Sequence, residues 1–230
     1  MDMNGVTKFA ALGFALVLSA CVGSEPASRN VTNDSLTLAS RNVEAPRNGA
    51  PRVMAPLYTI SDVQVTVPRS LSVSEANGYY PMADIVWRGD PMGDRHQQIA
   101  AIFQASAERA ASSMAGPRRA VLSLELVRFH GVTEKTRYTI GGTHNMVFDM
   151  TVRDAATGAV IDGPRRVAAD ARAAGGQAAI AEEQAGRTQK VVVTEKLVET
   201  LRRELSGPVT DPALVARATQ NPGNPVLVAR

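Results

Sequence analysis

Histidine is the residue type in this sequence best suited to metal binding or acid-base chemistry, and three are present: His96, His130 and His144. None of them has the spacing of an HExxH motif, which places two ligands one helical turn apart. Even if His130 and His144 met across paired strands, Asp149 would point to the opposite face of the strand from His144. No fourth ligand is evident either. We therefore predict solvated or hydrogen-bonded histidines, no metal site and no cofactor.

Other side chains that could carry catalysis also lack suitable surroundings. No serine stands in a G-x-S-x-G or S-x-x-K pattern at a strand-to-helix turn. The glycine pairs Gly141-Gly142 and Gly175-Gly176 fit bulges or strand ends rather than a phosphate-binding loop. Glu182 and Glu183 lie in an alanine-rich segment typical of a solvated helix. We predict that the chain is not an enzyme, and the remaining enzymatic alternative is a hydrolase with an unrecognised site.

The single cysteine, Cys21, stands directly after an apolar stretch from Phe9 to Ala20. One cysteine excludes an intrachain disulfide and a cysteine-based zinc site. A stretch of twelve residues is too short to span a membrane, which takes about 20. Because Lys8 precedes the stretch and small residues end it, residues 1–20 are predicted to be a secretory signal, cleaved between Ala20 and Cys21.

The residues Leu18-Ser19-Ala20-Cys21 resemble the lipobox of bacterial lipoproteins, in which the cysteine thiol accepts diacylglycerol. Several acyl chains on one residue give a stable anchor, because each buried CH₂ adds about 0.8 kcal/mol. We expect a lipid-anchored chain without a transmembrane helix. Val22 replaces the aspartate typical of inner-membrane retention, so we expect the outer membrane, facing the periplasm, with the inner membrane as the alternative. An ordinary signal peptide with a chance cysteine, or a buried helix, is the other interpretation.

The rest of the chain divides by composition. Residues 21–57 are rich in Ser, Asn, Pro, Ala and Arg and show no hydrophobic periodicity. This composition predicts a lipidated N-terminus followed by a flexible linker. Residues 58–206 are predicted to form a periplasmic domain. Residues 207–230, with three prolines after Pro208, are predicted to be an extended or disordered tail.

The charge of the chain is small, at +3 from 25 basic and 22 acidic residues. Aromatic residues make up only 4% and do not alternate with the basic ones, so we expect no nucleic-acid partner. Arginines occur in pairs, and we interpret these pairs as solvated ends of strands and helices. The alternative is a site for phosphate or anionic lipid. These pairs are Arg118-Arg119, Arg165-Arg166 and Arg202-Arg203.

Hydrophobic periodicity predicts an α+β two-layer sandwich, with a mostly antiparallel sheet of about five strands covered by two helices. The predicted strands are residues 58–68, 83–88, 120–129, 136–153 and 159–171. The predicted helices are residues 94–114 and 187–205, each ended by Gly-Pro.

Several faces of these elements are predicted to be buried. The first helix buries Ile99, Ile102, Phe103, Ser106, Ala110 and Met114, and the second Val191, Thr194, Val198, Leu201 and Leu205. The strands bury Leu122, Leu124, Leu126, Met146, Phe148, Met150, Val152, Val167, Ala169 and Ala171.

The loop from Trp87 to His96 is our candidate interaction surface. It holds the only tryptophan beside Arg88 and Asp90, and tryptophan and arginine are enriched at interface hot spots. The alternative is that Trp87 fills the core under the helix. An open edge of the sheet, which could receive a partner strand, is a second candidate.

The stretches ADIVWRGDPMGDRH (83–96) and RYTIGGTHNMVFDMTVRDAATG (137–158) resemble an uncharacterised lipoprotein family of marine alphaproteobacteria. The resemblance covers residues 58–206 and implies no catalytic residue. The arrangement also looks, at the level of fold, like auxiliary lipoproteins of lipid-trafficking ABC transporters and lipoprotein cofactors of cell-wall synthases.

From these features we expect a membrane-anchored, non-enzymatic scaffold or accessory subunit that binds another envelope protein. The alternative is a lipid-handling component of an ABC-type transport system. That role needs an apolar groove between helix and sheet, lined by Ile99, Phe103, Met146 and Phe148, and a sealed core would count against it.

Overall fold

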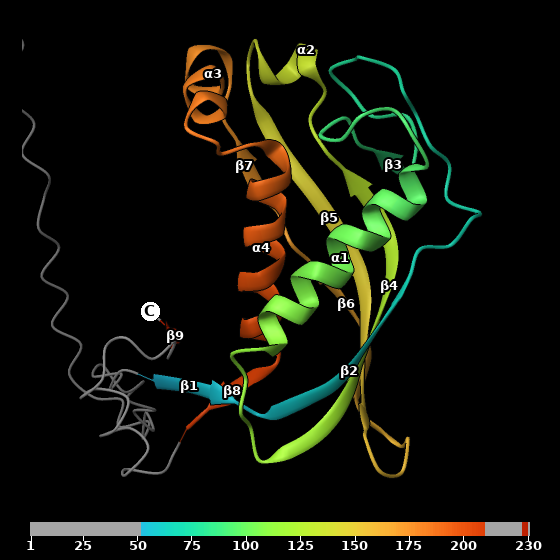
Figure 1. Ribbon diagram of the computed structural model, residues 1–230, viewed down its shortest axis with the longest axis vertical. Helices are drawn as coiled ribbons and strands as arrows, with labels where there is room; N and C mark the ends of the chain where they lie inside the picture. Colours follow the sequence, from blue (N-terminus) through green and yellow to red (C-terminus); the bar gives the residue numbers. More distant parts are fainter. Residues whose placement is uncertain (1–51, 210–226, 230) are drawn as a thin grey trace, which may run out of the picture. The chain divides into compact units, whose positions relative to one another are not determined.

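A computed structural model describes residues 52–209 and 227–229 (Figure 1). The predicted signal peptide, its cleavage site at Ala20 and Cys21, and most of the linker lie outside the described residues. Within the described residues, no helix has both the length and the apolar character needed to cross a membrane.

The main sheet contains six strands. Its central path runs in the order β2 (Tyr58–Thr66), β4 (Arg118–His130), β5 (Gly142–Asp154) and β6 (Val160–Ala168). The short strands β3 (Ile85–Val86) and β7 (Ala171–Ala173) pair with β4 and β5 respectively. β2 and β3 run parallel to β4, and the other pairings are antiparallel. The α+β prediction with a mostly antiparallel sheet is therefore confirmed.

Two long helices, α1 (Arg95–Ala111) and α4 (Gln189–Glu204), pack against each other over one face of this sheet (Figure 1). The carboxylate of Asp94 accepts a hydrogen bond from the Gln97 N–H at 3.1 Å and caps the start of α1. The Thr188 hydroxyl accepts one from the Val191 N–H and caps α4 in the same way.

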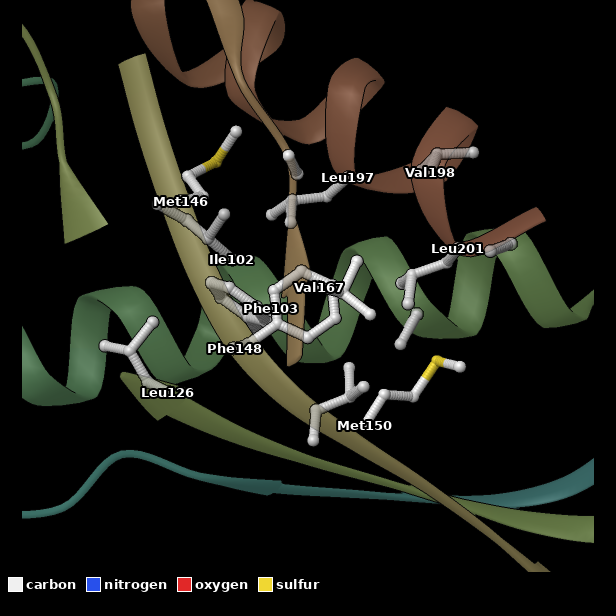
Figure 2. Close-up of a cluster of buried hydrophobic side chains, with 14 of the residues drawn as sticks. Ile102, Phe103, Leu126, Met146, Phe148, Met150, Val167, Leu197, Val198 and Leu201 are labelled. Atoms are coloured by element: carbon white, nitrogen blue, oxygen red, sulfur yellow. The ribbon is translucent and has the colours of Figure 1, made fainter. Parts of the chain in front are cut away.

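The core lies between these helices and the sheet. The faces predicted for the first helix and for the strands are buried as expected. Phe103 of α1 meets Phe148 of β5 edge to face, with ring centroids 5.3 Å apart (Figure 2). Ile99, Phe103, Met146 and Phe148 are each at most 1% exposed. The interface between helix and sheet is therefore sealed, which counts against the lipid groove.

The buried face of α4 differs from the prediction. Val191 is 37% exposed, while Val192, Val193 and Leu197 are buried. The run Val191–Val193 is apolar at three consecutive positions, so local periodicity could not decide which of them faces inward.

Helix α2 (Glu134–Arg137) occupies the start of the segment predicted as a strand from residue 136. Thr133 caps this helix by accepting a hydrogen bond from the Thr136 N–H, and β5 begins only at Gly142. The alanine-rich stretch forms a separate helix, α3 (Gly176–Gln184), and the predicted return strand is divided into β6 and β7.

A second, three-stranded sheet extends the folded part beyond the predicted boundaries of 58 and 206. Its order is β8 (Ser206–Pro208), β1 (Arg52–Pro56) and β9 (Leu227–Ala229), all antiparallel. β1 lies in the segment predicted as linker, and β9 lies in the predicted tail. Strands of three to five residues are too short for alternation to reveal them.

Candidate functional site

The Trp87 side chain is fully buried. Its indole packs edge to face on Phe129, with ring centroids 5.3 Å apart, and its N–H donates to the Asp90 carboxylate at 2.8 Å. The prediction that Trp87 forms part of an interaction surface is therefore wrong for this side chain, and the alternative, that it fills the core, is correct.

The other predicted surface residues are half-buried and hold neighbouring segments together. Lys190 on α4 donates to Asp90 at 2.8 Å. Burial alone would raise the pKa of Asp90, but the hydrogen bonds from Lys190 and Trp87 outweigh it and the pKa is lowered. His96 Nε2 contacts the Leu71 carbonyl at 3.1 Å.

Arg88 and a residue that the sequence did not reveal, Arg95, fix the loop between β2 and β3. Arg95 is only 5% exposed and donates to both carboxylate oxygens of Glu75, at 2.7 and 3.0 Å. The hydrogen bond from Arg95 lowers the pKa of Glu75. Arg88 donates to the Glu75 carbonyl at 2.7 Å and to the Glu134 carboxylate on α2. These contacts hold residues 67–84 against α1 and α2.

The loop so held presents a group of exposed apolar side chains together with the end of α2. We call Tyr79, Tyr80, Met82, Tyr138 and Ile140 the tyrosine surface. Tyr80 is 85% exposed, Met82 91% and Ile140 76%, while Tyr79 and Tyr138 are partly exposed. Three of the four tyrosines in the chain lie here.

A cavity of about 510 Å³ opens at the tyrosine surface, between the diverging ends of β4 and β5. Its volume falls within the roughly 300–1,000 Å³ range of ligand sites. Tyr79, Tyr80 and Ile140 border it, together with several glycines and threonines. The Thr133 hydroxyl donates to the Gly78 carbonyl at 2.7 Å and closes the loop onto α2. The cavity lining consists of Gly78, Tyr79, Tyr80, Pro81, Val86, His130, Gly131, Val132, Thr133, Thr136, Ile140, Gly141, Gly142 and Thr143.

An apolar cavity between α1 and α4 is smaller, at about 240 Å³, below the range typical of small-molecule sites. Met114 and Val198 lie on its wall and Arg109 and Arg202 beside them.

Most of the paired arginines are engaged in ion pairs. Arg118 pairs with Asp154 at 3.0 Å and Arg166 with Asp149 at 3.0 Å, while Arg165 and Arg203 pair with Glu204 at 2.6 and 3.1 Å. These contacts favour the structural interpretation of the pairs over a phosphate or anionic-lipid site.

The histidines are hydrogen-bonded to the backbone, and no group of three metal-ligating side chains occurs among the described residues. His130 Nε2 contacts the Ala83 carbonyl at 2.7 Å, and burial lowers the pKa of this imidazole. His144 is fully buried and accepts from the Val132 N–H at 3.3 Å.

Three solved structures are similar in part to this chain. A protein of Xanthomonas campestris assigned to family DUF330 is 12% identical, with a TM-score of 0.39, covering 75% of this chain and 93% of its own. A candidate lipoprotein of Caulobacter crescentus CB15 is 16% identical, with a TM-score of 0.29, covering 62% and 86%. A minor lipoprotein of Acinetobacter baumannii is 10% identical, with a TM-score of 0.28, covering 63% and 91%.

A comparison with curated proteins finds no match. A comparison with protein families matches residues 58–221, which include the main sheet, both long helices and the tyrosine surface, to a family of unknown function, DUF6778. The expectation of an uncharacterised family is thus confirmed, while its alphaproteobacterial origin stays a prediction. The chain belongs to the DUF6778 family.

Proposed function

We propose that this protein is a lipid-anchored scaffold or accessory subunit that binds another envelope protein and carries out no catalysis itself. Its tyrosine surface is the observation that carries the proposal. Exposed apolar groups that gather on one surface mark interaction sites on folded domains, and Tyr79, Tyr80 and Ile140 border one cavity. Tyrosine and methionine are enriched at protein interfaces, where tyrosine buries a large area and keeps a polar tip for hydrogen bonding.

The surface is also held in a defined shape before any partner binds. The Lys135 ammonium lies over the Tyr79 ring, 4.6 Å from its centroid, and the Lys135 backbone N–H donates to Asn77 Oδ1 at 2.9 Å. The loop behind the tyrosines is fixed through Glu75. A partner therefore pays little ordering cost at this site, and preorganised surfaces bind more tightly for the same contact area.

The lipid anchor supplies the second half of the proposal. Cys21 is the attachment point, and the outer membrane facing the periplasm is the proposed location. Thirty residues separate Cys21 from β1, and such a chain can reach at most about 100 Å. The tyrosine surface can thus meet a partner that stands away from the membrane.

Crosslinking in cells tests the proposed surface. A photoreactive amino acid at Tyr80 or Ile140 is expected to give one discrete crosslinked species, which mass spectrometry then identifies. The same amino acid at Val160, which is 47% exposed on β6, serves as the matched control. Equal crosslinking from all three positions, or none from Tyr80 and Ile140, would contradict the proposed surface.

Replacing Cys21 with alanine is expected to abolish lipidation, because the thiol is the nucleophile that accepts the diacylglycerol. Cells fed radiolabelled palmitate should label the wild-type chain and leave the Cys21→Ala chain unlabelled. Labelled palmitate that still enters the variant would refute the anchor, and membrane fractionation of the wild type distinguishes outer from inner membrane.

A further inference from the structure

Two basic side chains outside the surface described above are buried near each other: Arg137, the last residue of α2, and His144 on β5. The guanidinium of Arg137 is 1% exposed and His144 is fully buried. Arg137 Nη2 donates to the Glu183 carboxylate on α3 at 2.8 Å and approaches the Ala179 carbonyl at 3.5 Å. Its Nε and Nη1 atoms are buried and have no acceptor among the described residues.

His144 adds another donor of the same kind. Its Nδ1 accepts the hydrogen bond from the Val132 N–H, so the proton of the neutral ring sits on Nε2. Nε2 is buried and also has no acceptor within the described part of the chain. Burial, with a smaller contribution from the nearby charge of Arg137, lowers the pKa of His144 to about 4, so the ring is neutral at pH 7.

The three groups without a partner, Arg137 Nε and Nη1 and His144 Nε2, are all hydrogen-bond donors. A ligand at this place must therefore be a hydrogen-bond acceptor. A buried polar group without a partner costs about 1–3 kcal/mol, and more when it is charged, so native proteins rarely leave several together. A water molecule would accept from these donors but would bring two hydrogens that need acceptors of their own. Chloride only accepts and bicarbonate brings a single O–H donor, and charged acceptors form the stronger hydrogen bonds with arginine.

The local charge also favours an anion. Glu183 is the carboxylate that pairs with Arg137, and its side chain is 43% exposed. Solvent therefore screens its negative charge, while the guanidinium sits in the interior and keeps a positive field there.

We propose that Arg137 and His144 form a buried site for a small inorganic anion of chloride or bicarbonate size. The anion accepts from Arg137 Nε and Nη1 and from His144 Nε2. Val132 and Thr136, the immediate neighbours of the site, line the 510 Å³ cavity. A bound anion thus braces α2, whose C-cap residue is Tyr138 of the tyrosine surface. This inference does not depend on the proposed partner binding.

A direct test is crystallisation of the full chain with sodium bromide in place of chloride. We expect one anomalous peak in hydrogen-bonding contact with Arg137 and His144. A site that holds only an ordered water molecule, or no density, in bromide and in bicarbonate would overturn the proposal.

Thermal unfolding of the full chain tests the site in solution and identifies the anion. Sodium chloride and sodium bicarbonate are each compared with sodium gluconate at equal ionic strength, since gluconate is too bulky for a closed site. We expect Tm to rise by roughly 3–6 °C for a tenfold excess of anion over its Kd. The salt that gives the larger rise identifies the preferred anion, and equal Tm values in all three salts contradict the proposal.

Matched variants separate this effect from general salt stabilisation. The rise should disappear in Arg137→Met and in His144→Phe and should persist in Arg166→Met, where a surface guanidinium pairs with Asp149. If Arg137→Met does not fold, His144→Phe and the bromide crystals still decide the question. A rise that persists in His144→Phe would exclude the imidazole from the site.

Discussion

Replacing Phe148 with alanine is expected to lower the free energy of unfolding by about 3–5 kcal/mol. Phe148 projects from β5, one of the two inner strands of the main sheet, and is fully buried between the sheet and α1. Its removal loses the transfer free energy of the ring and the edge-to-face contact with Phe103, and leaves a cavity that rigid strands on both sides cannot close. Urea denaturation of the full chain, followed by circular dichroism, measures the change.

Ile140→Ala is the matched control for this prediction. Ile140 is also a large apolar residue, but it is 76% exposed, so we expect a change within about 0.5 kcal/mol. A loss below 1 kcal/mol in Phe148→Ala would show that the core is less tightly packed than described, and would reopen the lipid-handling alternative that a sealed interface argues against.

The parts of the fold predicted correctly are those in which a long element shows one clear period. Alternation along β5 predicted the burial of every second residue from Met146 to Val152. The helical spacing of apolar residues from Ile99 to Met114 predicted the buried face of the first helix. In both elements local propensity and tertiary burial favour the same face. The sequence therefore carries this information within a window of ten to twenty residues.

Elements that the sequence did not reveal depend on distant partners. β1 exists as a strand only because β8 and β9, far along the chain, pair with it. The buried face of α4 could begin at any of three consecutive valines, and only contact with α1 and the sheet determines which of them are buried. Pairing and packing with distant segments leave no pattern in a short stretch of sequence.

The candidate site shows the same limit. Tyr79 and Tyr80 are about 60 residues before Tyr138 and Ile140, and hydrogen bonds from α2 to Gly78 bring them together. Tryptophan is enriched at interfaces, but residue type alone does not distinguish a surface anchor from a core residue such as Trp87. Thr133 followed by Glu134 was a local signal for α2 that could have been used.

Acidification from pH 6.5 to 4 is expected to destabilise the protein through His144 by about 3 kcal/mol. Burial, followed by the charge of Arg137, lowers the pKa of His144 from 6.5 to about 4 in the folded chain. The unfolded chain therefore binds the proton first, so the free energy of unfolding falls as pH falls through this window. The loss is complete below pH 4, where both states carry the proton.

The variant His144→Asn isolates this contribution, because the asparagine amide oxygen can still accept from the Val132 N–H and does not titrate. Carboxylates with lowered pKa values, such as Glu75 and Glu134, titrate alike in both proteins and cancel in the difference. Urea unfolding in gluconate should give curves that converge as pH falls from 6.5 to 4, and parallel curves would refute the assignment. A bound anion stabilises the protonated ring, so chloride, which stays an anion throughout this pH window, should shrink the pH effect in the wild type and leave His144→Asn unchanged.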